Sequence, residues 1–247
     1  MENILKENER IDDLGIKNLK IIQNPNGFCF GIDSVLLSDF AKEIKSGSKV
    51  VDLGTGTGIL GILLCGKTQA ASILGVEIQE DVADMARRSI ILNNLEKRFT
   101  IINTDIKKIK NRVKINSYDV IITNPPYKKL NTGKTNENEK KLISKHEITA
   151  DLSDFIKTSY SLLKDNGALY MVHRTERLTD IMSELRANKI EPKIIRFVYS
   201  NEIEESKLVL IKAVKNAKPF LKIAKPLYIY DRKGNYTKEI LEIYNKK

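Results

Sequence analysis

One short motif in this sequence combines the residue types that chemistry on a planar nitrogen requires. Asn124-Pro125-Pro126-Tyr127 follows an apolar run, Tyr118–Thr123, that predicts a buried strand. An amino group conjugated to a ring is a poor nucleophile, because its lone pair is delocalised. The Asn124 side-chain oxygen and the Pro125 carbonyl can accept its hydrogens and free that lone pair. The two prolines fix the backbone, and Tyr127 can stack on the planar group.

A glycine turn upstream predicts a nucleotide-type cofactor site. The segment from Gly56 to Gly61 matches the GxGxxG pattern, and it follows an apolar run that ends at Asp52. Glu77 stands about 20 residues downstream, where dinucleotide sites keep the acid that binds ribose. On this pattern alone, a dehydrogenase stays open as an alternative.

The carboxylate of Asp52 favours a different cofactor. It would repel a pyrophosphate, which binds to backbone N–H groups. It would suit S-adenosyl-L-methionine, which has no phosphate and carries an ammonium and a sulfonium. Glu77 can accept from ribose hydroxyls, and Asp105 can accept from an adenine amino group or cap a helix. Acids after three successive predicted strands place a ligand along the carboxyl edge of a parallel sheet, and the predicted reaction is methyl transfer.

Apolar runs alternate with helical patterns, which predicts an α/β fold with a mostly parallel sheet and helices on both faces. The expected strands are Lys49–Leu53, Ser72–Ile78, Phe99–Asn103, Tyr118–Thr123, Ala168–His173, Ile194–Tyr199 and Leu208–Val214. A 3.6-residue period after Asp151 predicts a helix that this residue caps and that Asn166-Gly167 ends. The expected organisation is an extended segment over 1–31, which closes the cofactor site, a main domain over 32–218 and a tail over 219–247.

Composition narrows the partners and the compartment. The 247 residues include 42 Lys and Arg against 32 Asp and Glu, a net charge of +10 that favours a polyanionic partner. No apolar run is long enough for a membrane span, and the N-terminus is too polar for a signal peptide. Cys29 and Cys65 form no metal or redox motif. We therefore expect a cytoplasmic protein that uses no metal, is bound to no membrane and acts as a monomer.

The motifs resemble, in chain order, those of class I S-adenosylmethionine-dependent methyltransferases that act on adenine N6 or related planar nitrogens. The segments that carry this resemblance are Asp52–Gly58, Glu77, Asp105 and Asn124–Tyr127. Flanking segments resemble the bacterial valine-tRNA adenine N6-methyltransferases, which modify the adenine 3′ of the anticodon. Those segments are Gly27–Leu37, Lys145-His146-Glu147 and Pro226–Asp231.

This resemblance implies a Rossmann-like fold with a seven-stranded sheet whose last strand is antiparallel. It implies that the cofactor is bound by Gly31, Ile32, Asp33, Asp52, Gly54, Gly56, Glu77, Ile78, Asp105, Ile106 and Asn124. The catalytic group that presents the target base would be Asn124, Pro125, Pro126 and Tyr127.

A long polar loop over 128–147 directly follows the Asn-Pro-Pro-Tyr motif and is the candidate RNA-binding segment. Its candidate contacts to tRNA are Lys128, Lys129, Lys134, Lys145 and His146. Further basic clusters cover 107–114 and 212–225. An adenine in a tRNA loop is largely unpaired, so its extrusion costs little. The open alternatives are ribosomal RNA guanine N2, a translation-factor glutamine amide, and a tRNA-binding protein without catalysis.

Overall fold

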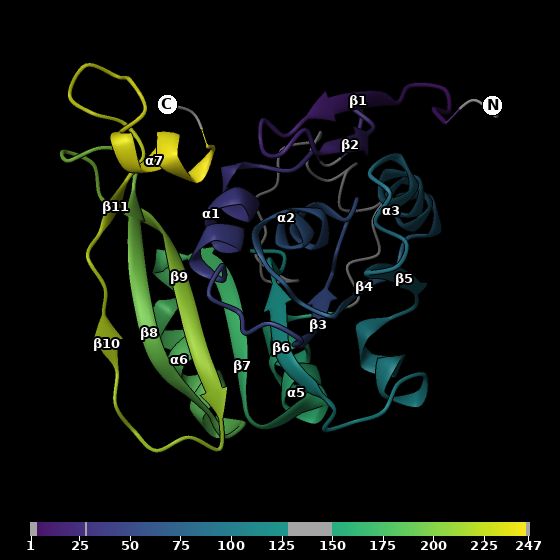
Figure 1. Cartoon of the computed structure of the whole chain (residues 1–247). Helices are drawn as coiled ribbons and strands as arrows, with labels where there is room; N and C mark the ends of the chain where they lie inside the picture. The colour runs from purple at the N-terminus through teal and green to yellow at the C-terminus, as the bar shows by residue number, and fades with distance from the viewer. Residues whose placement is uncertain (1–3, 28, 128–149, 246–247) are drawn as a thin grey trace.

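One mixed sheet forms the centre of the computed structural model, which describes residues 4–27, 29–127 and 150–245 (Figure 1). The strands of the sheet lie in the order β10-β8-β9-β7-β6-β3-β4-β5, and β11 also pairs with β8. Their bounds are β3 Lys49–Leu53, β4 Ser72–Glu77, β5 Phe99–Asn103, β6 Tyr118–Thr123, β7 Leu163–Arg174, β8 Ile190–Tyr199, β9 Ser206–Lys215, β10 Lys222–Ile223 and β11 Leu227–Tyr228.

Strand direction agrees with the sequence prediction. β3 pairs in parallel with β4 and β6, and the parallel pairing continues to β5 and to β7. β9 runs antiparallel to both β7 and β8. The seven predicted strands are therefore present, the last of them, β9, is antiparallel as predicted, and β10 and β11 bring the sheet to nine strands. The two-residue strands β10 and β11 were not predicted, because two residues are too few for a periodic signal.

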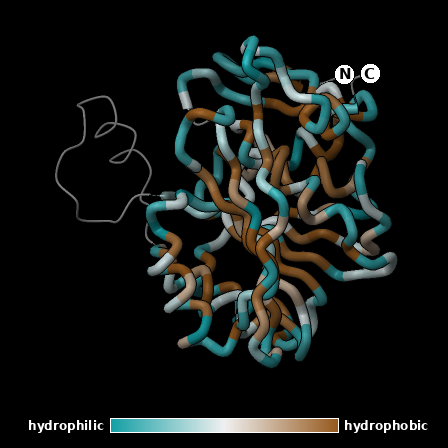
Figure 2. Tube along the Cα trace, turned by 90° about the vertical axis from the view of Figure 1, so that its left-hand side faces the viewer, coloured by the Kyte–Doolittle hydropathy of each residue, from teal (hydrophilic) through white to brown (hydrophobic). Residues whose placement is uncertain are grey.

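Helices cover both faces of the sheet. The helices are α1 Ile32–Phe40, α2 Ile59–Lys67, α3 Glu80–Leu92, α5 Leu152–Leu162, α6 Leu178–Ala187 and α7 Lys238–Ile243, with short 3-10 helices η1 Ile106–Asn111 and η2 Thr175–Arg177. Neighbouring strand residues such as Val50 and Val51 point into different core clusters, one packed against α1 and α2 and the other against α5 and α6. Figure 2 shows the hydrophobic residues gathered along the middle of the molecule. Among the described residues, no helix is long and apolar enough to cross a membrane.

The helix after Asp151 begins as predicted and ends earlier. Asp151 and Asp154 form a reciprocal capping box at its N-terminus. The helix stops at Leu162, and β7 begins at the next residue, so the predicted stop at Asn166-Gly167 is wrong. Asn166 has a φ of +60°, and the pairing of β6 with β7 is irregular near this point. An Asn-Gly pair serves a strand irregularity as well as a helix end, because both need positive φ.

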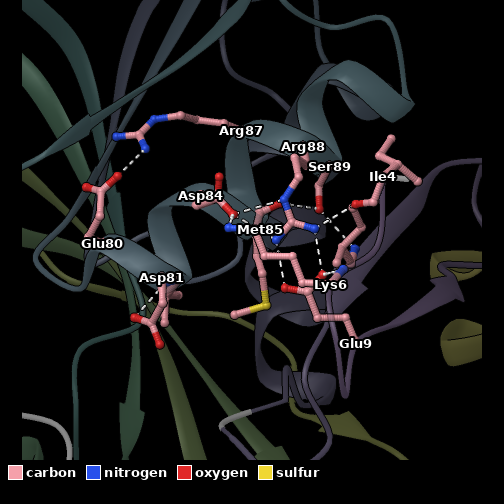
Figure 3. A network of polar contacts seen from close by, with 12 residues as sticks. Ile4, Lys6, Glu9, Glu80, Asp81, Asp84, Met85, Arg87, Arg88 and Ser89 are labelled. Atoms are coloured by element: carbon pink, nitrogen blue, oxygen red, sulfur yellow. Dashed lines mark hydrogen bonds and ion pairs between the residues drawn. The ribbon is translucent and has the colours of Figure 1, made fainter. Parts of the chain in front are cut away.

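The N-terminal segment forms a hairpin, β1 Arg10–Asp13 with β2 Lys20–Gln23, which lies on α3. The Ile22 N–H donates to Ser89 Oγ at 2.9 Å. Arg88 holds the preceding residues: its two terminal nitrogens donate to the two Glu9 carboxylate oxygens at 2.6 and 2.7 Å (Figure 3). Arg88 also donates to Asp84 and to the Ile4 carbonyl. Two charged side chains, 14% and 7% exposed, therefore attach the start of the chain to α3.

We predict that Arg88→Ala lowers the free energy of unfolding by about 2–3 kcal/mol at pH 7, because it leaves the nearly buried Glu9 carboxylate without its partner. The hydrogen bonds from Arg88 lower the pKa of Glu9. A carboxyl whose pKa is lower in the folded state stabilises the fold at pH values above its unfolded-state pKa. This contribution is lost as the pH falls through the folded-state pKa. Urea denaturation from pH 7 to pH 3 should therefore show the difference between the two proteins shrinking.

Arg87→Ala is the matched control on the same helix. Arg87 pairs with Glu80 at 2.8 Å, and both side chains are largely in solvent. Such a pair contributes about 0.5 kcal/mol or less. Equal losses in the Arg87 and Arg88 variants would show that the contact with Glu9 does not anchor the segment.

Candidate active site

A pocket of about 560 Å³ lies at the carboxyl ends of β3, β4 and β6 and is bordered by the N-terminal segment. It brings together most of the residues that the sequence predicted for cofactor and target. Those lining it are Gly31, Asp33, Gly54, Gly56, Glu77, Ile78, Asp105, Ile106, Asn124, Pro125, Pro126 and Tyr127. Asn24, Gly27 and Cys29 also line the pocket, so part of the predicted 1–31 segment borders the site.

Two predicted cofactor residues do not line the pocket. Ile32 is half-buried and packs against the core cluster around α1 and α2. Asp52 is completely buried behind the glycine turn. The sequence placed Asp52 correctly near the end of a strand, and it could not show that the side chain is buried and does not reach the pocket.

The glycine turn is shaped for close approach at Gly56 and for close packing at Gly61. Gly56 has a φ of +57°, and a Cβ added there would meet no atom within 4 Å, so the space above it is open. Gly61 lies in the first turn of α2 against the ring of Phe99, where an added Cβ would stand 2.2 Å from a ring carbon. Gly56 therefore serves the pocket, and Gly61 serves the packing of α2 on β5.

Glu77 is fixed with its carboxylate at the pocket wall. One carboxylate oxygen accepts the Gly56 N–H at 2.9 Å, and the other accepts the Gln79 N–H at 3.0 Å. Burial raises the pKa of Glu77. Each oxygen keeps a lone pair beyond its backbone bond, so the carboxylate can accept two further hydrogen bonds from a ligand such as a ribose.

Asp52 is a buried acid with an unsatisfied oxygen. Its Oδ2 accepts the Thr55 hydroxyl at 2.5 Å, and among the described residues its Oδ1 has no hydrogen-bond partner. Burial raises the pKa of Asp52 to about 7, and the charge of Glu77 adds to the rise. Two neighbouring carboxylates behind an open turn suit a ligand that carries positive charge, as S-adenosylmethionine does.

Asp105 combines the two tasks that the sequence left open. Its side chain accepts the Lys107 N–H at 2.9 Å and so caps η1. The Lys107 ammonium lies 3.8 Å from the other carboxylate oxygen. Asp105 also lines the pocket, beside Ile106. Capping therefore fixes the side chain at the edge of the cavity and leaves it accessible to a ligand.

The Asn-Pro-Pro-Tyr motif closes the opposite end of the pocket. The Tyr127 hydroxyl lies 2.6 Å from an Asp33 carboxylate oxygen and 2.8 Å from Asn124 Oδ1. The hydroxyl has one proton, so it serves one of these acceptors at a time. Burial, followed by the charge of Asp33, raises the pKa of Tyr127 and keeps the phenol neutral. The motif is thereby connected to the start of α1, which belongs to a distant part of the sequence.

Arg174 lines this end of the pocket and His173 packs against Tyr127, and the sequence prediction missed both. His173 is fully buried, its ring centroid lies 5.1 Å from that of Tyr127, and its Nδ1 accepts the Arg174 N–H at 2.8 Å. Burial lowers the pKa of His173 to about 4, so it is neutral at pH 7. The Arg174 guanidinium lies over the Tyr127 ring, 5.2 Å from the centroid. A sequence signal for both residues existed. The predicted strand Ala168–His173 ends at His173, Arg174 follows it, and this strand lies next to β6, whose end carries the motif.

The five candidate RNA contacts lie outside the described residues, so the structure does not place them. They are Lys128, Lys129, Lys134, Lys145 and His146. In the part of the chain that is described, no group of three or more His, Cys, Asp or Glu residues could hold a metal ion.

Fold and site together define a class I methyltransferase of Rossmann-like architecture, whose cofactor is S-adenosylmethionine. The chain belongs to the methyltransferase small domain family, whose family model matches residues 18–191. Because this is a family of methyltransferases, the predicted cofactor is confirmed and the dehydrogenase alternative is excluded.

Curated relatives carry a more specific name. A tRNA1(Val) (adenine(37)-N6)-methyltransferase of Porphyromonas gingivalis is 28% identical over 175 residues, which cover 69% of this chain and 68% of that protein. A protein of the same name from Tolumonas auensis is 29% identical over 157 residues, 63% of each chain.

Two solved structures share the fold. A predicted O-methyltransferase of Agrobacterium tumefaciens superposes with a TM-score of 0.70 at 19% identity, and the match covers 86% of this chain and 95% of that one. Pyrococcus horikoshii TYW2 in complex with MeSAdo gives a TM-score of 0.60 at 14% identity, covering 86% and 73%.

We predict that Asp52→Asn stabilises the protein above pH 7 when no cofactor is bound. A carboxyl whose pKa rises from 3.8 to about 7 on folding opposes folding once it ionises. Stability then falls as pH rises from about 4 to 7 and stays low above that range. At 1.36 kcal/mol per pKa unit, the loss is on the order of 4 kcal/mol, and the Asn variant does not suffer it.

The same variant should bind S-adenosylmethionine more weakly, because the attraction of a buried carboxylate for an ammonium or sulfonium is gone. Urea denaturation at pH 5, 6, 7 and 8 measures the first effect, and calorimetric titration measures the second. Parallel stability profiles in the two proteins would contradict ionisation of Asp52 in this range.

Proposed function

We propose that this protein methylates the exocyclic N6 of adenine 37, 3′ of the anticodon, in a valine tRNA. The observation that carries the proposal is the position of Asn124-Pro125-Pro126-Tyr127, which lines the same pocket as the glycine turn. The motif suits a planar amino group, and the curated relatives named above act on that adenine according to their names. The net charge of +10 favours a polyanionic substrate.

The cofactor is held in this proposal along the carboxyl edge of the sheet. Gly54 and Gly56 approach the methionine part, Glu77 accepts from the ribose, and Asp105 accepts from the adenine, with Ile78 and Ile106 against the ring. Asp52 acts through its charge from behind the turn. The segment 1–31, which ends at Gly31, closes the site together with Ile32 and Asp33. The open space above Gly56 and the unpartnered oxygen of Asp52 support this arrangement.

S-adenosylmethionine supplies an electrophilic methyl group on its sulfonium. The chain's task is to make the amino nitrogen nucleophilic and to aim its lone pair at that methyl. Asn124 Oδ1 has two lone pairs, so it can accept an amino hydrogen beside its contact with Tyr127. The Pro125 carbonyl accepts the second hydrogen. The nitrogen releases a proton after it gains the methyl, so no strong base is required.

The RNA side of the proposal rests on charge and on the chain's connectivity. The segment 128–147 leaves the motif directly, and Lys128, Lys129, Lys134, Lys145 and His146 remain predicted contacts. A loop adenine needs little energy to leave its neighbours, because it is not paired. Stacking on Tyr127 would replace the stacking that the base loses.

Incubation with methyl-labelled cofactor, total RNA and a protein extract tests the proposal directly. N6-methyladenosine in digested tRNA, placed by fragment mapping next to the valine anticodon, is the expected result. Label in N2-methylguanosine of ribosomal RNA, or on a glutamine amide of a protein, would replace this function by the corresponding alternative. An absence of label in every fraction would favour a protein that binds without catalysis.

We predict that Tyr127→Ala lowers kcat/KM for RNA by roughly 5- to 150-fold, because a base–aromatic contact contributes about 1–3 kcal/mol. Tyr127→Phe keeps the ring and loses only the contacts of the hydroxyl with Asp33 and Asn124, so it should retain most of the activity. Steady-state kinetics on the tRNA substrate compares the two. Equal activity in the Ala variant and the wild type would refute stacking.

Asn124→Ala should abolish methyl transfer while S-adenosylmethionine still binds, because the acceptor for the amino hydrogen is lost. Transfer assays report the first property and calorimetry the second. An active Asn124→Ala enzyme would contradict the assignment of Asn124 as that acceptor.

A further inference from the structure

The charged groups that line the pocket are distributed unevenly. Four carboxylates reach its wall, those of Asp33, Glu77, Asp81 and Asp105. Arg174 is the one cationic side chain among the described lining residues. A cofactor with an ammonium, a sulfonium and a ribose explains the carboxylates in the pocket wall. It does not by itself explain a guanidinium at the end of the pocket that receives the target base.

The strand order places this guanidinium beyond the target position. Asp105 follows β5, Glu77 ends β4, the glycine turn follows β3, Asn124 follows β6, and Arg174 ends β7. These strands are parallel neighbours in the order β5, β4, β3, β6, β7. The cofactor residues thus occupy one stretch of the edge, the target motif comes next, and Arg174 stands one strand further on, away from Glu77 and Asp105.

Arg174 has no carboxylate partner among the described residues, unlike Arg177 and Arg196. Arg177 pairs with Asp180 at 2.8 Å, and Arg196 pairs with Glu239 at 2.8 Å. Arg174 is exposed, and its guanidinium contacts the face of the Tyr127 ring. Its backbone is held by the contact of its N–H with His173. The side chain is therefore a positioned and accessible cation that is free to pair with an anion from a ligand.

We propose that the Arg174 guanidinium binds a backbone phosphate of the RNA next to the target adenine. A base that reaches Asn124 and Tyr127 carries its ribose and phosphates on the side away from the cofactor, which is the side of Arg174. The guanidinium presents a fork of N–H donors that matches two phosphate oxygens. When the Arg174 guanidinium leaves the face of the Tyr127 ring to bind a phosphate, it replaces a weak contact by a stronger one. The inference depends on the proposed RNA substrate.

Arg174→Gln, Arg174→Lys and a control, Arg232→Gln, test the inference in the full-length protein. Arg232→Gln removes the same charge from an exposed site, where the Arg232 side chain pairs with Glu202 at 2.8 Å. A phosphate contact is equal in the bound substrate and the transition state, so its loss raises KM and leaves kcat nearly unchanged. We expect the KM for tRNA to rise about 10-fold in the Gln variant, and we expect the slope of log affinity against log salt to fall by about 1.

The Lys variant should keep the salt slope and recover part of the affinity, because it retains the charge without the fork. The control should match the wild type in both measurements. If the Arg174→Gln variant keeps the salt slope and the KM of the wild type, the inference is overturned. A loss of S-adenosylmethionine binding in that variant would also overturn it, since it would place the guanidinium at the cofactor. A wild-type protein that neither binds nor methylates RNA would instead remove the proposed function itself.

Discussion

The site depends on the parallel register of β3 between β4 and β6. Leu53 lies opposite Val76 on one side and Thr123 on the other. The residues that follow this row in the chain are Gly54, Glu77 and Asn124. The Thr123 hydroxyl donates to the Leu53 carbonyl at 2.8 Å and holds the row together. A slip of one residue would turn every side chain to the other face, so the register brings the glycine turn, the ribose acid and the target motif to one edge of the sheet (Figure 1).

The same edge concentrates negative charge at a cost to stability. Asp52 and Glu77 are buried close enough for one to raise the pKa of the other. Neither forms an ion pair among the described residues; each is held by hydrogen bonds from the glycine turn or its neighbours. A cationic ligand relieves this repulsion, and binding to the folded state then stabilises the protein. Destabilising repulsion of this kind is expected at a site that is arranged to bind a ligand and not to maximise the stability of the fold.

Several elements could be predicted from the sequence, because their signal is local. The strand ending at Thr123 is a continuous apolar run, and the motif after it is contiguous in sequence. The misplaced helix end at Asn166-Gly167 and the inward turn of Asp52 depend on pairing and side-chain direction, which no local pattern contains. Arg174 was missed for another reason: its importance comes from the neighbour of its strand. Once β7 is known to pair with β6, the end of β7 must lie beside the motif.

Tyr127 joins the two halves of the site. Its hydroxyl reaches Asp33 at the start of α1, next to the segment that borders the cofactor pocket. Its ring contacts His173 and Arg174, which end the strand on the target side. A change in the position of this ring therefore alters contacts on both sides at once. Because the buried His173 is neutral, it supports the ring by packing alone and leaves Arg174 as the charge that faces the solvent. Cofactor closure and target placement thus share one aromatic side chain, and neither can be arranged independently of the other.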